Sequence, residues 1–360
     1  MALAAAGVWE VRTAGNDTNG GGFKAGASGT DYSQQDAKNT AGDNISTTDA
    51  VADGTTTITS ATATFTSAIV GNFIYFQGGT GAIAAVWREC TVFTNSTTIT
   101  IDASIAASTG MTMNIGGALV SVGMVGASLV SGNKIFIASG TYSITSSTAN
   151  VSGGRLSITV TNVVVEGYGS TRGDLGTPPL LQVSGAISGF NIVISTANDT
   201  QLRNFTVDGA AKATMTGVNL QNRGIAYKVR AVNCTTTGLN SANTADQWVQ
   251  CSTAACGTGV NGPGRFIACE VTTSTTRGFD DNSTAATYER CISYANTGGT
   301  NDGFMMQAVW SGCWNCVAYG NGRDGFRSQA GGSVCVNCIS EANGGWGYNM
   351  VASPMNLFLC

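Results

Sequence analysis

The strongest constraint in this sequence is a pattern that recurs about every 22 residues from residue 230 onward. Three kinds of residue keep one phase in it. The anchor cysteines are separated by 17, 18, 22, 25, 22 and 22 residues and are Cys234, Cys251, Cys269, Cys291, Cys316, Cys338 and Cys360. An asparagine follows the later anchors by five, at Asn296, Asn321 and Asn343. Gly-aromatic pairs take the same steps, at Gly278-Phe279, Gly303-Phe304, Gly325-Phe326 and Gly347-Tyr348. Each repeat is therefore predicted to be one structural unit.

A unit of this length fits one turn of a parallel β-solenoid, with three short strands and three turns. Charged residues make up only 11% of the chain and glycines number 49, a composition that disfavours helices. Short apolar runs bounded by Asn and Gly, such as Phe266-Ile267 and Cys291-Ile292, favour strands. One rung cannot bury its inner face alone, so stacked rungs must share a core. We expect the cysteines to form an internal column and the asparagines to hydrogen-bond along the stack.

Three segments carry a resemblance to a known fold family. "RCISYANTGGTNDGF" (290–304), "NCVAYGNGRDGF" (315–326) and "VNCISEANGGWGY" (336–348) resemble the rungs of right-handed parallel β-helix proteins of the pectate-lyase-like type. "NKIFIASGTYSIT" (133–145) and "TNVVVEGYGS" (161–170) look like its opening rungs. The resemblance covers about 130–360 and implies an all-β solenoid. It leaves function open, because this fold hosts lyases, hydrolases, adhesins and phage spikes.

The composition changes along the chain and predicts four parts. Residues 1–45 read as an extended anchor segment with little apolar periodicity, and 46–116 as a small β-barrel or sandwich of alternating strands. Residues 117–132 read as a capping helix or linker, and 133–360 as the parallel β-helix. Because Cys360 falls within a rung and a bare solenoid end exposes hydrogen-bonding groups, we expect the solenoid to continue beyond it or to be covered by a partner.

Cys313-x-x-Cys316 and Cys335-x-x-Cys338 match the spacing of a zinc site. The repeat gives a simpler reading, since Cys313 and Cys335 occupy a generic apolar position that holds Trp248 and Phe266 in other rungs. Residues three apart in an extended strand point to opposite faces, so the four thiolates are not expected to converge. We predict reduced, metal-free cysteines and no cofactor.

Carboxylates offer the only catalytic candidates. Asp302 and Asp324 share a repeat position before Gly-Phe, and Asp280 and Asp281 follow an equivalent Gly-Phe. Carboxylate pairs roughly 5–9.5 Å apart serve glycoside hydrolysis. The competing interpretation is that Asp-Gly is a turn dipeptide that recurs because the turn recurs.

Aromatic and aliphatic residues predict surfaces for binding. Tyr294 and Tyr319 share a repeat position, and Trp310, Trp314 and Trp346 lie near them in the sequence. Such aromatic residues suit sugar stacking or a subunit interface. One residue after each anchor, an apolar column is expected to point outward, formed by Ile292, Val317 and Ile339. This column favours side-by-side association, as a homotrimer by resemblance to β-helical spikes.

The sequence also excludes several classes of function. It has no histidine, which removes Ser-His-Asp and Cys-His catalysis and histidine metal ligands. Net charge is −4 without a basic run, so nucleic acid is not an expected partner. Apolar stretches are broken by Gly and Ser, so membrane insertion is not expected, and residues 1–8 lack the basic start of a secretory signal.

Together these features predict a virion structural protein, made in the host cytoplasm. We expect a phage appendage (a tailspike, fibre or capsid-decorating protein) that contacts other virion proteins through its N-terminal region. Its β-helix would bind a host-surface polysaccharide without cleaving it. Two alternatives stay open: a polysaccharide lyase or hydrolase that uses carboxylates on the β-helix face, and a bacterial adhesin or filament subunit at the cell surface.

Overall fold

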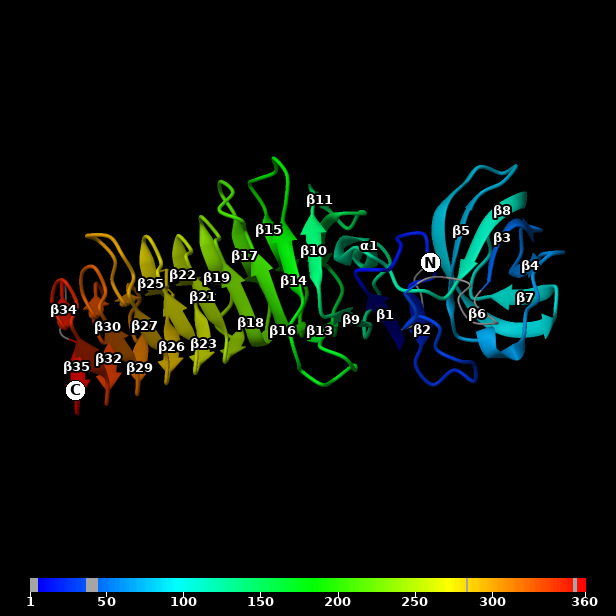
Figure 1. The fold of residues 1–360 in the computed structure, drawn as a ribbon. Helices are drawn as coiled ribbons and strands as arrows, with labels where there is room; N and C mark the ends of the chain where they lie inside the picture. The colour runs from blue at the N-terminus through cyan, green and yellow to red at the C-terminus, as the bar shows by residue number, and fades with distance from the viewer. Residues whose placement is uncertain (1–5, 37–44, 283, 352–354) are drawn as a thin grey trace. The chain divides into compact units, whose positions relative to one another are not determined.

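The computed structural model describes residues 6–36, 45–282, 284–351 and 355–360 (Figure 1). It forms two compact units. The first contains Met1–Tyr142, Ala149–Gly154 and Val163–Thr177, and the second contains Ser143–Thr148, Arg155–Asn162 and Pro178–Cys360. The chain passes between them within β10 (Thr141–Ile144), β11 (Ser146–Ala149) and β12 (Gly154–Ile158). No described helix is long and apolar enough to span a bilayer.

The second unit is a parallel β-solenoid of about 8 turns, as the sequence predicts. Each full rung passes through three sheets, and its strands pair in parallel with those of the next rung (Figure 1). The first sheet contains β20 (Gln247–Val249), β23 (Gly264–Ile267), β26 (Ala286–Glu289), β29 (Gly312–Trp314), β32 (Val334–Val336) and β35 (Asn356–Phe358). The second contains β14 (Leu180–Val183), β21 (Ser252–Ala254), β24 (Glu270–Thr272), β27 (Ile292–Tyr294), β30 (Val317–Tyr319) and β33 (Ile339–Glu341). The third begins with β11 and β12 and continues with β15 (Asn191–Ser195), β17 (Thr216–Leu220), β19 (Thr237–Ser241), β22 (Thr258–Asn261), β25 (Arg277–Asp280), β28 (Phe304–Met306), β31 (Phe326–Ser328) and β34 (Tyr348–Met350).

The corner between the first and second sheets is a single residue in the left-handed conformation. In the earlier rungs one long strand runs through this corner, β16 (Gln201–Asp208) and then β18 (Ile225–Val232). One left-handed residue is enough to turn the chain, and parallel strand pairing continues directly on both sides of it. Eight rungs repeat this corner with φ between 51° and 55°, at Asn204, Lys228, Gln250, Ala268, Arg290, Asn315, Asn337 and Leu359.

The residue after this corner points inward, and there the cysteines stack. The register Trp314↔Val336 places Cys316 and Cys338 on neighbouring rungs, which confirms the predicted solenoid. Each thiol donates to a backbone carbonyl of the preceding rung. The Sγ of Cys269 lies 3.3 Å from the oxygen of Trp248, and the Sγ of Cys291 lies 3.3 Å from that of Phe266. Burial raises the pKa of the Cys291 thiol far above its usual value, so it remains a neutral donor.

Cys234, which the spacing assigns to the anchor column, belongs to the other corner. The register Val232↔Ala254 aligns it with Cys256 instead, between the second and third sheets. Both corners consist of a left-handed residue followed by an inward residue, here Asn233 before Cys234. A buried cysteine fits either place, and this is why the step of 17 residues departs from the repeat.

The two Cys-x-x-Cys pairs differ from the expectation that their side chains point to opposite faces. All four side chains are buried, at Cys313, Cys316, Cys335 and Cys338. The chain between each pair is not extended, because Asn315 and Asn337 have φ of 55° and 51°. The left-handed residue reverses the alternation, so both cysteines of a pair point inward.

Two further ladders run inside the solenoid. Phe279, Phe304, Phe326 and Tyr348 stack nearly parallel, with ring centroids 4.7, 4.9 and 5.2 Å apart. At the second corner the Nδ2 of Asn296 donates to Asn321 at 2.6 Å, and that of Asn321 to Asn343 at 2.8 Å. The Gly-aromatic and Asn markers of the repeat therefore mark core contacts.

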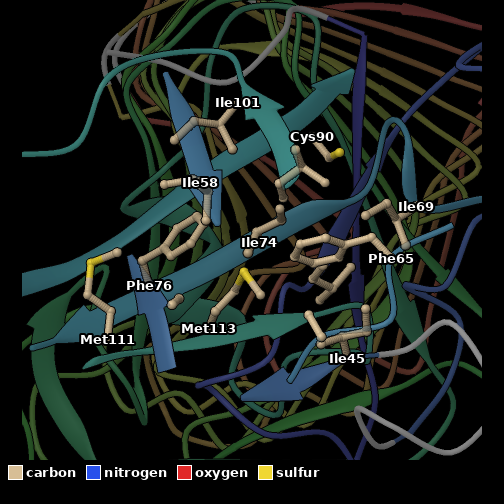
Figure 2. Close-up of a cluster of buried hydrophobic side chains, with 14 of the residues drawn as sticks. Ile45, Ile58, Phe65, Ile69, Ile74, Phe76, Cys90, Ile101, Met111 and Met113 are labelled. Atoms are coloured by element: carbon tan, nitrogen blue, oxygen red, sulfur yellow. The ribbon is translucent and has the colours of Figure 1, made fainter. Parts of the chain in front are cut away.

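The first unit contains a closed antiparallel barrel in the strand order β3-β4-β7-β6-β5-β8. Its strands are β3 (Ser46–Ala52), β4 (Thr57–Thr59), β5 (Phe73–Gly78), β6 (Ile83–Asn95), β7 (Thr98–Ile101) and β8 (Ser108–Ile115), with a 3-10 turn at Ser67–Ile69. Figure 2 shows the side chains that fill it, among them Ile58, Phe76 and Met113, all fully buried. The alternating Thr-Ile pattern of 98–101 points one row of side chains into this core.

The segment 1–45 is not wholly extended and separate. Its β1 (Gly7–Val11) pairs in parallel with β9 (Lys134–Ala138) and antiparallel with β2 (Gly22–Lys24), while β13 (Val164–Tyr168) pairs with the other edge of β9. Trp9 and Val11 are fully buried there. Residues 1–5 and 37–44 of this segment lie outside the described residues. The sequence alone did not predict β1, because this strand has only five residues and lies in a glycine-rich segment.

The expected capping helix at 117–132 is reduced to α1 (Val122–Gly126). Just before it, Leu119 forms an isolated parallel bridge with Val11, and Gly117 has a positive φ of 72°, so neither belongs to a helix. The glycines at 116, 117, 123 and 126 lower helix propensity across the segment.

Candidate functional site

Asp302 and Asp324 lie on neighbouring rungs, because Phe304 pairs with Phe326. Both carboxylates are buried and engaged by their own chain. The two carboxylate oxygens of Asp302 accept from one edge of the Arg323 guanidinium, Oδ1 from Nε at 2.7 Å and Oδ2 from Nη2. Asp324 accepts from the backbone N–H of Trp346 at 2.8 Å and from Asn349 at 2.7 Å. These contacts join adjacent rungs and leave little of either carboxylate for a substrate.

Asp280 and Asp281 are also engaged by residues of their own chain. Asp280 pairs with Arg277 and accepts from the Nε2 of Gln307 at 2.6 Å. Asp281 is fully buried and accepts from the backbone N–H groups of Gln307 and Ala308 at 2.8 and 3.1 Å. Carboxylates held in this way suit turn stabilisation better than proton transfer to a ligand.

The five aromatic candidates occupy four separate places. Tyr294 and Tyr319 are adjacent on the outer side of the second sheet, through the pairing of β27 with β30. Trp314 lies on the first sheet with its ring over Gly312, where an added Cβ would come within 2.1 Å of it. Trp310 and Trp346 are 75% and 71% exposed in turns that precede β29 and β34. The two tyrosines alone form a shared surface.

We call the outer side of the second sheet the lateral face. Its strands are short, so each rung presents two outward residues there, before and after one buried residue. The row nearer the first corner is Thr206, Arg230, Ser252, Glu270, Ile292, Val317 and Ile339. The row nearer the second corner is Asp208, Val232, Ala254, Thr272, Tyr294, Tyr319 and Glu341. The face is thus polar over its first rungs and apolar-aromatic over its last.

An open groove of about 470 Å³ lies over the polar part of the lateral face. Its lining includes both rows and the second corner, and consists of Leu180, Thr206, Asp208, Arg230, Val232, Asn233, Ala254 and Ala255. Asp208 is fixed by Gln182 at 2.9 Å and by Asn233 at 3.0 Å. Arg230 is exposed and forms no salt bridge with another described residue. The groove therefore offers one exposed cation beside a fixed carboxylate and an amide.

Farther along the same face, the Tyr294 hydroxyl donates to the Glu270 carboxylate at 2.9 Å. This hydrogen bond to a carboxylate raises the pKa of Tyr294 above its ordinary value near 10. The phenol is thus neutral and its ring is held over the strand. Tyr319 is 50% exposed on the next rung. The pair provides two neighbouring aromatic rings beyond the groove.

Sequence reasoning missed Asp208, Arg230 and Glu270. The repeat frame was anchored on cysteine, and the earlier rungs have Phe205 and Val229 at the anchor position. If any inward apolar residue is accepted in place of the anchor cysteine, the repeat extends back to Val229 and Phe205. Arg230 then aligns with Ile292, and the row of residues that lines the groove can be identified.

Among the described residues, no group of three or more Cys, Asp or Glu side chains is placed to hold a metal ion. The lateral groove contributes one carboxylate, Asp208, which already accepts three hydrogen bonds. What this surface can do chemically is bind: it offers donors, acceptors and aromatic faces along a line that crosses successive rungs.

No protein-family model matches the sequence, and no curated protein matches it either. Among solved structures, it is similar to a pectate lyase with 16% identity and a TM-score of 0.53, over 66% of this chain and 73% of the enzyme. Lower scores relate it to a mannuronan C-5 epimerase A-module from Azotobacter vinelandii (14% identity, TM-score 0.47) and to the tailspike of Pseudomonas phage LKA1 (13%, 0.26). These alignments cover 62% and 88% of this chain, and 66% and 63% of the other chains, so it spans less than two thirds of either. The second unit therefore has the parallel β-helix fold that this pectate lyase shares.

Proposed function

We propose that this protein is a virion appendage that binds a polysaccharide along its lateral face and does not cleave it. The observation that carries the proposal is the groove over β16, β18 and β21, with exposed Arg230 beside the fixed carboxylate of Asp208. A linear polymer suits this surface because each rung presents the same two outward positions. The neighbouring pectate lyase acts, by its name, on a polysaccharide, and this supports the same ligand class.

The charge and the rings specify the ligand further. A free guanidinium binds carboxylate or sulfate groups through paired N–H donors, so the groove favours an acidic polysaccharide. Tyr294 and Tyr319 lie farther along the same sheet and offer apolar faces for sugar rings. Hydrogen bonds to fixed Asp208 and Asn233 would orient the polymer between these groups.

Binding rather than cleavage follows from the state of the acidic candidates. Asp281, Asp302 and Asp324 are at most 1% exposed and hold backbone or guanidinium groups of adjacent rungs. A general acid must come within hydrogen-bonding distance of the atom that it protonates. Substrate could reach these carboxylates only by displacing contacts between rungs.

The virion role rests on the outward apolar column and on the first unit. Ile292 and Ile339 lie in the row nearer the first corner and are 41% and 58% exposed, which supports side-by-side association of solenoids along that edge and leaves the tyrosine row to the ligand. We propose a homotrimer of this kind, attached to the particle through the N-terminal region. Sedimentation analysis of the purified protein tests its oligomeric state: a complex of three chains is expected, and a monomer would contradict the proposal.

Affinity electrophoresis and calorimetry with polygalacturonate and alginate test the binding site. Arg230→Gln should weaken binding about tenfold or more, as expected for a lost charge-assisted hydrogen bond. Arg265→Gln is the matched control, because Arg265 is exposed on the first sheet and pairs with Glu289 at 2.8 Å. Equal effects of the two variants would contradict the lateral site. Shortening of the polymer, followed by size-exclusion chromatography, would contradict the non-enzymatic role.

A further inference from the structure

The third corner, between the third and first sheets, contains turns of unequal length. Five residues connect β19 to β20 and five connect β25 to β26, whereas Gly262-Pro263 alone connects β22 to β23. The short turn lies between the two long ones in the stack. This difference leaves a notch of about 470 Å³.

The short turn fits because of its glycines. Gly262 has φ of 96°, and an added Cβ would lie 1.9 Å from the carbonyl oxygen of Ser241 on the preceding rung. Gly264 has φ of 125° and would approach Asp246 within 3.0 Å. The backbone of this rung is thus drawn against its neighbour, and Pro263 is buried at the bottom of the notch.

The notch carries no charged side chain. One wall is formed by Ala242, Asn243 and Thr244 and the opposite wall by Asn282 and Thr284, with Asn240 and Ser241 at its edge. Asp246, at the end of the first long turn, is fully buried and accepts from Ser241 at 2.9 Å and from the Asn243 N–H at 3.2 Å. Both of its oxygens therefore already have partners in the protein, with the Gly224 N–H as a third donor at 2.8 Å.

Several polar groups of the walls remain available. Thr244, Asn282 and Thr284 are exposed, and their side chains form no hydrogen bond with another described residue. Together with Pro263 they line the notch. Neutral donors and acceptors around one small apolar surface match a pyranose ring, which has hydroxyls at its rim and C–H groups on its face.

An uncharged approach leads to the notch along the third sheet. Asn219, Asn240 and Asn261 form an outward ladder in which each Nδ2 donates to the preceding Oδ1 at 3.0 Å. Thr216, Thr237 and Thr258 pair in register as a second column. Three successive rungs therefore present the same neutral pattern up to the edge of the notch.

We propose that this notch is a second carbohydrate site, on a different sheet from the lateral face, and that it binds a hexose unit of a neutral glycan. The sugar ring fills the notch above Pro263, and its hydroxyls bond to Thr244, Asn282 and Thr284. An anionic sugar is disfavoured, because no cation lines the notch to offset the loss of its hydration. The two sites thus select different sugars.

Saturation-transfer NMR and calorimetry with cellohexaose, maltohexaose and mannohexaose test this site. At least one of these neutral oligosaccharides should bind, and Thr244→Val and Thr284→Val should each weaken it about 3- to 10-fold by removing one hydroxyl. Ala242→Trp should abolish binding by filling the notch. Thr236→Val is the control, because Thr236 is exposed outside the notch.

Arg230→Gln separates this inference from the proposed function. It should leave neutral binding unchanged while it weakens binding of polygalacturonate. Failure of all three neutral probes to bind the unmodified protein would overturn the inference. So would neutral binding that Thr244→Val, Thr284→Val and Ala242→Trp leave unchanged.

Discussion

Tyr288 provides the sharpest test of how the solenoid core is built. Its side chain is fully buried in the first sheet, and no described residue lies within hydrogen-bonding distance of its hydroxyl. Its ring contacts Phe266 at 5.4 Å and Phe279 at 5.3 Å between centroids. Burial raises the pKa of this phenol well above its ordinary value, so the hydroxyl stays protonated and has lost its water.

Tyr288→Phe is therefore expected to stabilise the protein. A buried hydroxyl without a partner costs about 1–3 kcal/mol, and removing it eliminates that cost. Removing the oxygen atom also leaves a small cavity, and the lost packing contacts offset a small part of this gain. Phe266, at the same position of the preceding rung, indicates that phenylalanine fits this column. We expect a net gain of about 1–2 kcal/mol, or roughly 2–8 °C in Tm for a cooperative unit of this size.

The assay is urea unfolding with calorimetry, and Tyr348→Phe is the matched control. The Tyr348 hydroxyl donates to the carbonyl oxygen of Cys338 at 2.7 Å, so this variant loses a made hydrogen bond. It should destabilise by about 0.5–1.5 kcal/mol. Opposite signs for the two variants support the reasoning. A loss of stability in Tyr288→Phe as large as in Tyr348→Phe would refute it.

Three further predictions concern the ladders, the glycines and a buried acid. Asn321→Ala should destabilise by about 1–3 kcal/mol in urea unfolding, because it removes the hydrogen bonds that join Asn321 to Asn296 and Asn343 in the ladder, while Asn337→Ala on the exposed corner should cost less. Gly325→Ala should cost about 1–3 kcal/mol, because its Cβ would lie 2.0 Å from the Ser340 Oγ; Gly299→Ala, with open space around it, should unfold like the unmodified protein. Burial raises the pKa of Asp246, so its contribution to stability is fully present below the unfolded value near pH 4 and is lost as pH rises through the folded pKa. The stability of the unmodified protein relative to Asp246→Asn should therefore fall as pH rises above about 4, and a rise would contradict this assignment.

The solenoid was predictable because its markers are core contacts. The Gly-aromatic pairs are the stacked ring ladder, and the later asparagines are the corner ladder. When equivalent residues of successive rungs stack on one another, the same residue types recur at a fixed spacing, and this period can be read from the sequence alone. The same logic failed where a rung uses another inward residue, as at Phe205 and Val229, and there the groove was missed.

Backbone conformation explains the other differences from the sequence analysis. Alternation of faces holds in extended strands, but the left-handed Asn315 and Asn337 turn both members of each cysteine pair inward. Asparagine adopts this conformation readily, yet Ala268, Arg290 and Leu359 adopt it at the same corner. Since those residues carry no sequence signal for a positive φ, the neighbouring rungs impose it.

The candidate site was less predictable than the fold. The sequence placed Tyr294 and Tyr319 side by side, and the strand register agrees. It grouped Trp310, Trp314 and Trp346 with them, although turns and a different sheet separate these residues in space. The notch depends on the relative lengths of three turns, which becomes visible only once the rungs are aligned.

The rung between Cys291 and Cys316 is three residues longer than its neighbours, and this has a consequence for how such a protein can diversify. The addition lies between Asn296 and Phe304, yet Ile292 still pairs with Val317 and Phe279 with Phe304. Extra residues are therefore absorbed outside the stack, and loop closure becomes only slowly more costly with length. The loops of such a solenoid can therefore change in length and sequence during evolution, or accept an engineered peptide, while the stacked core residues stay the same.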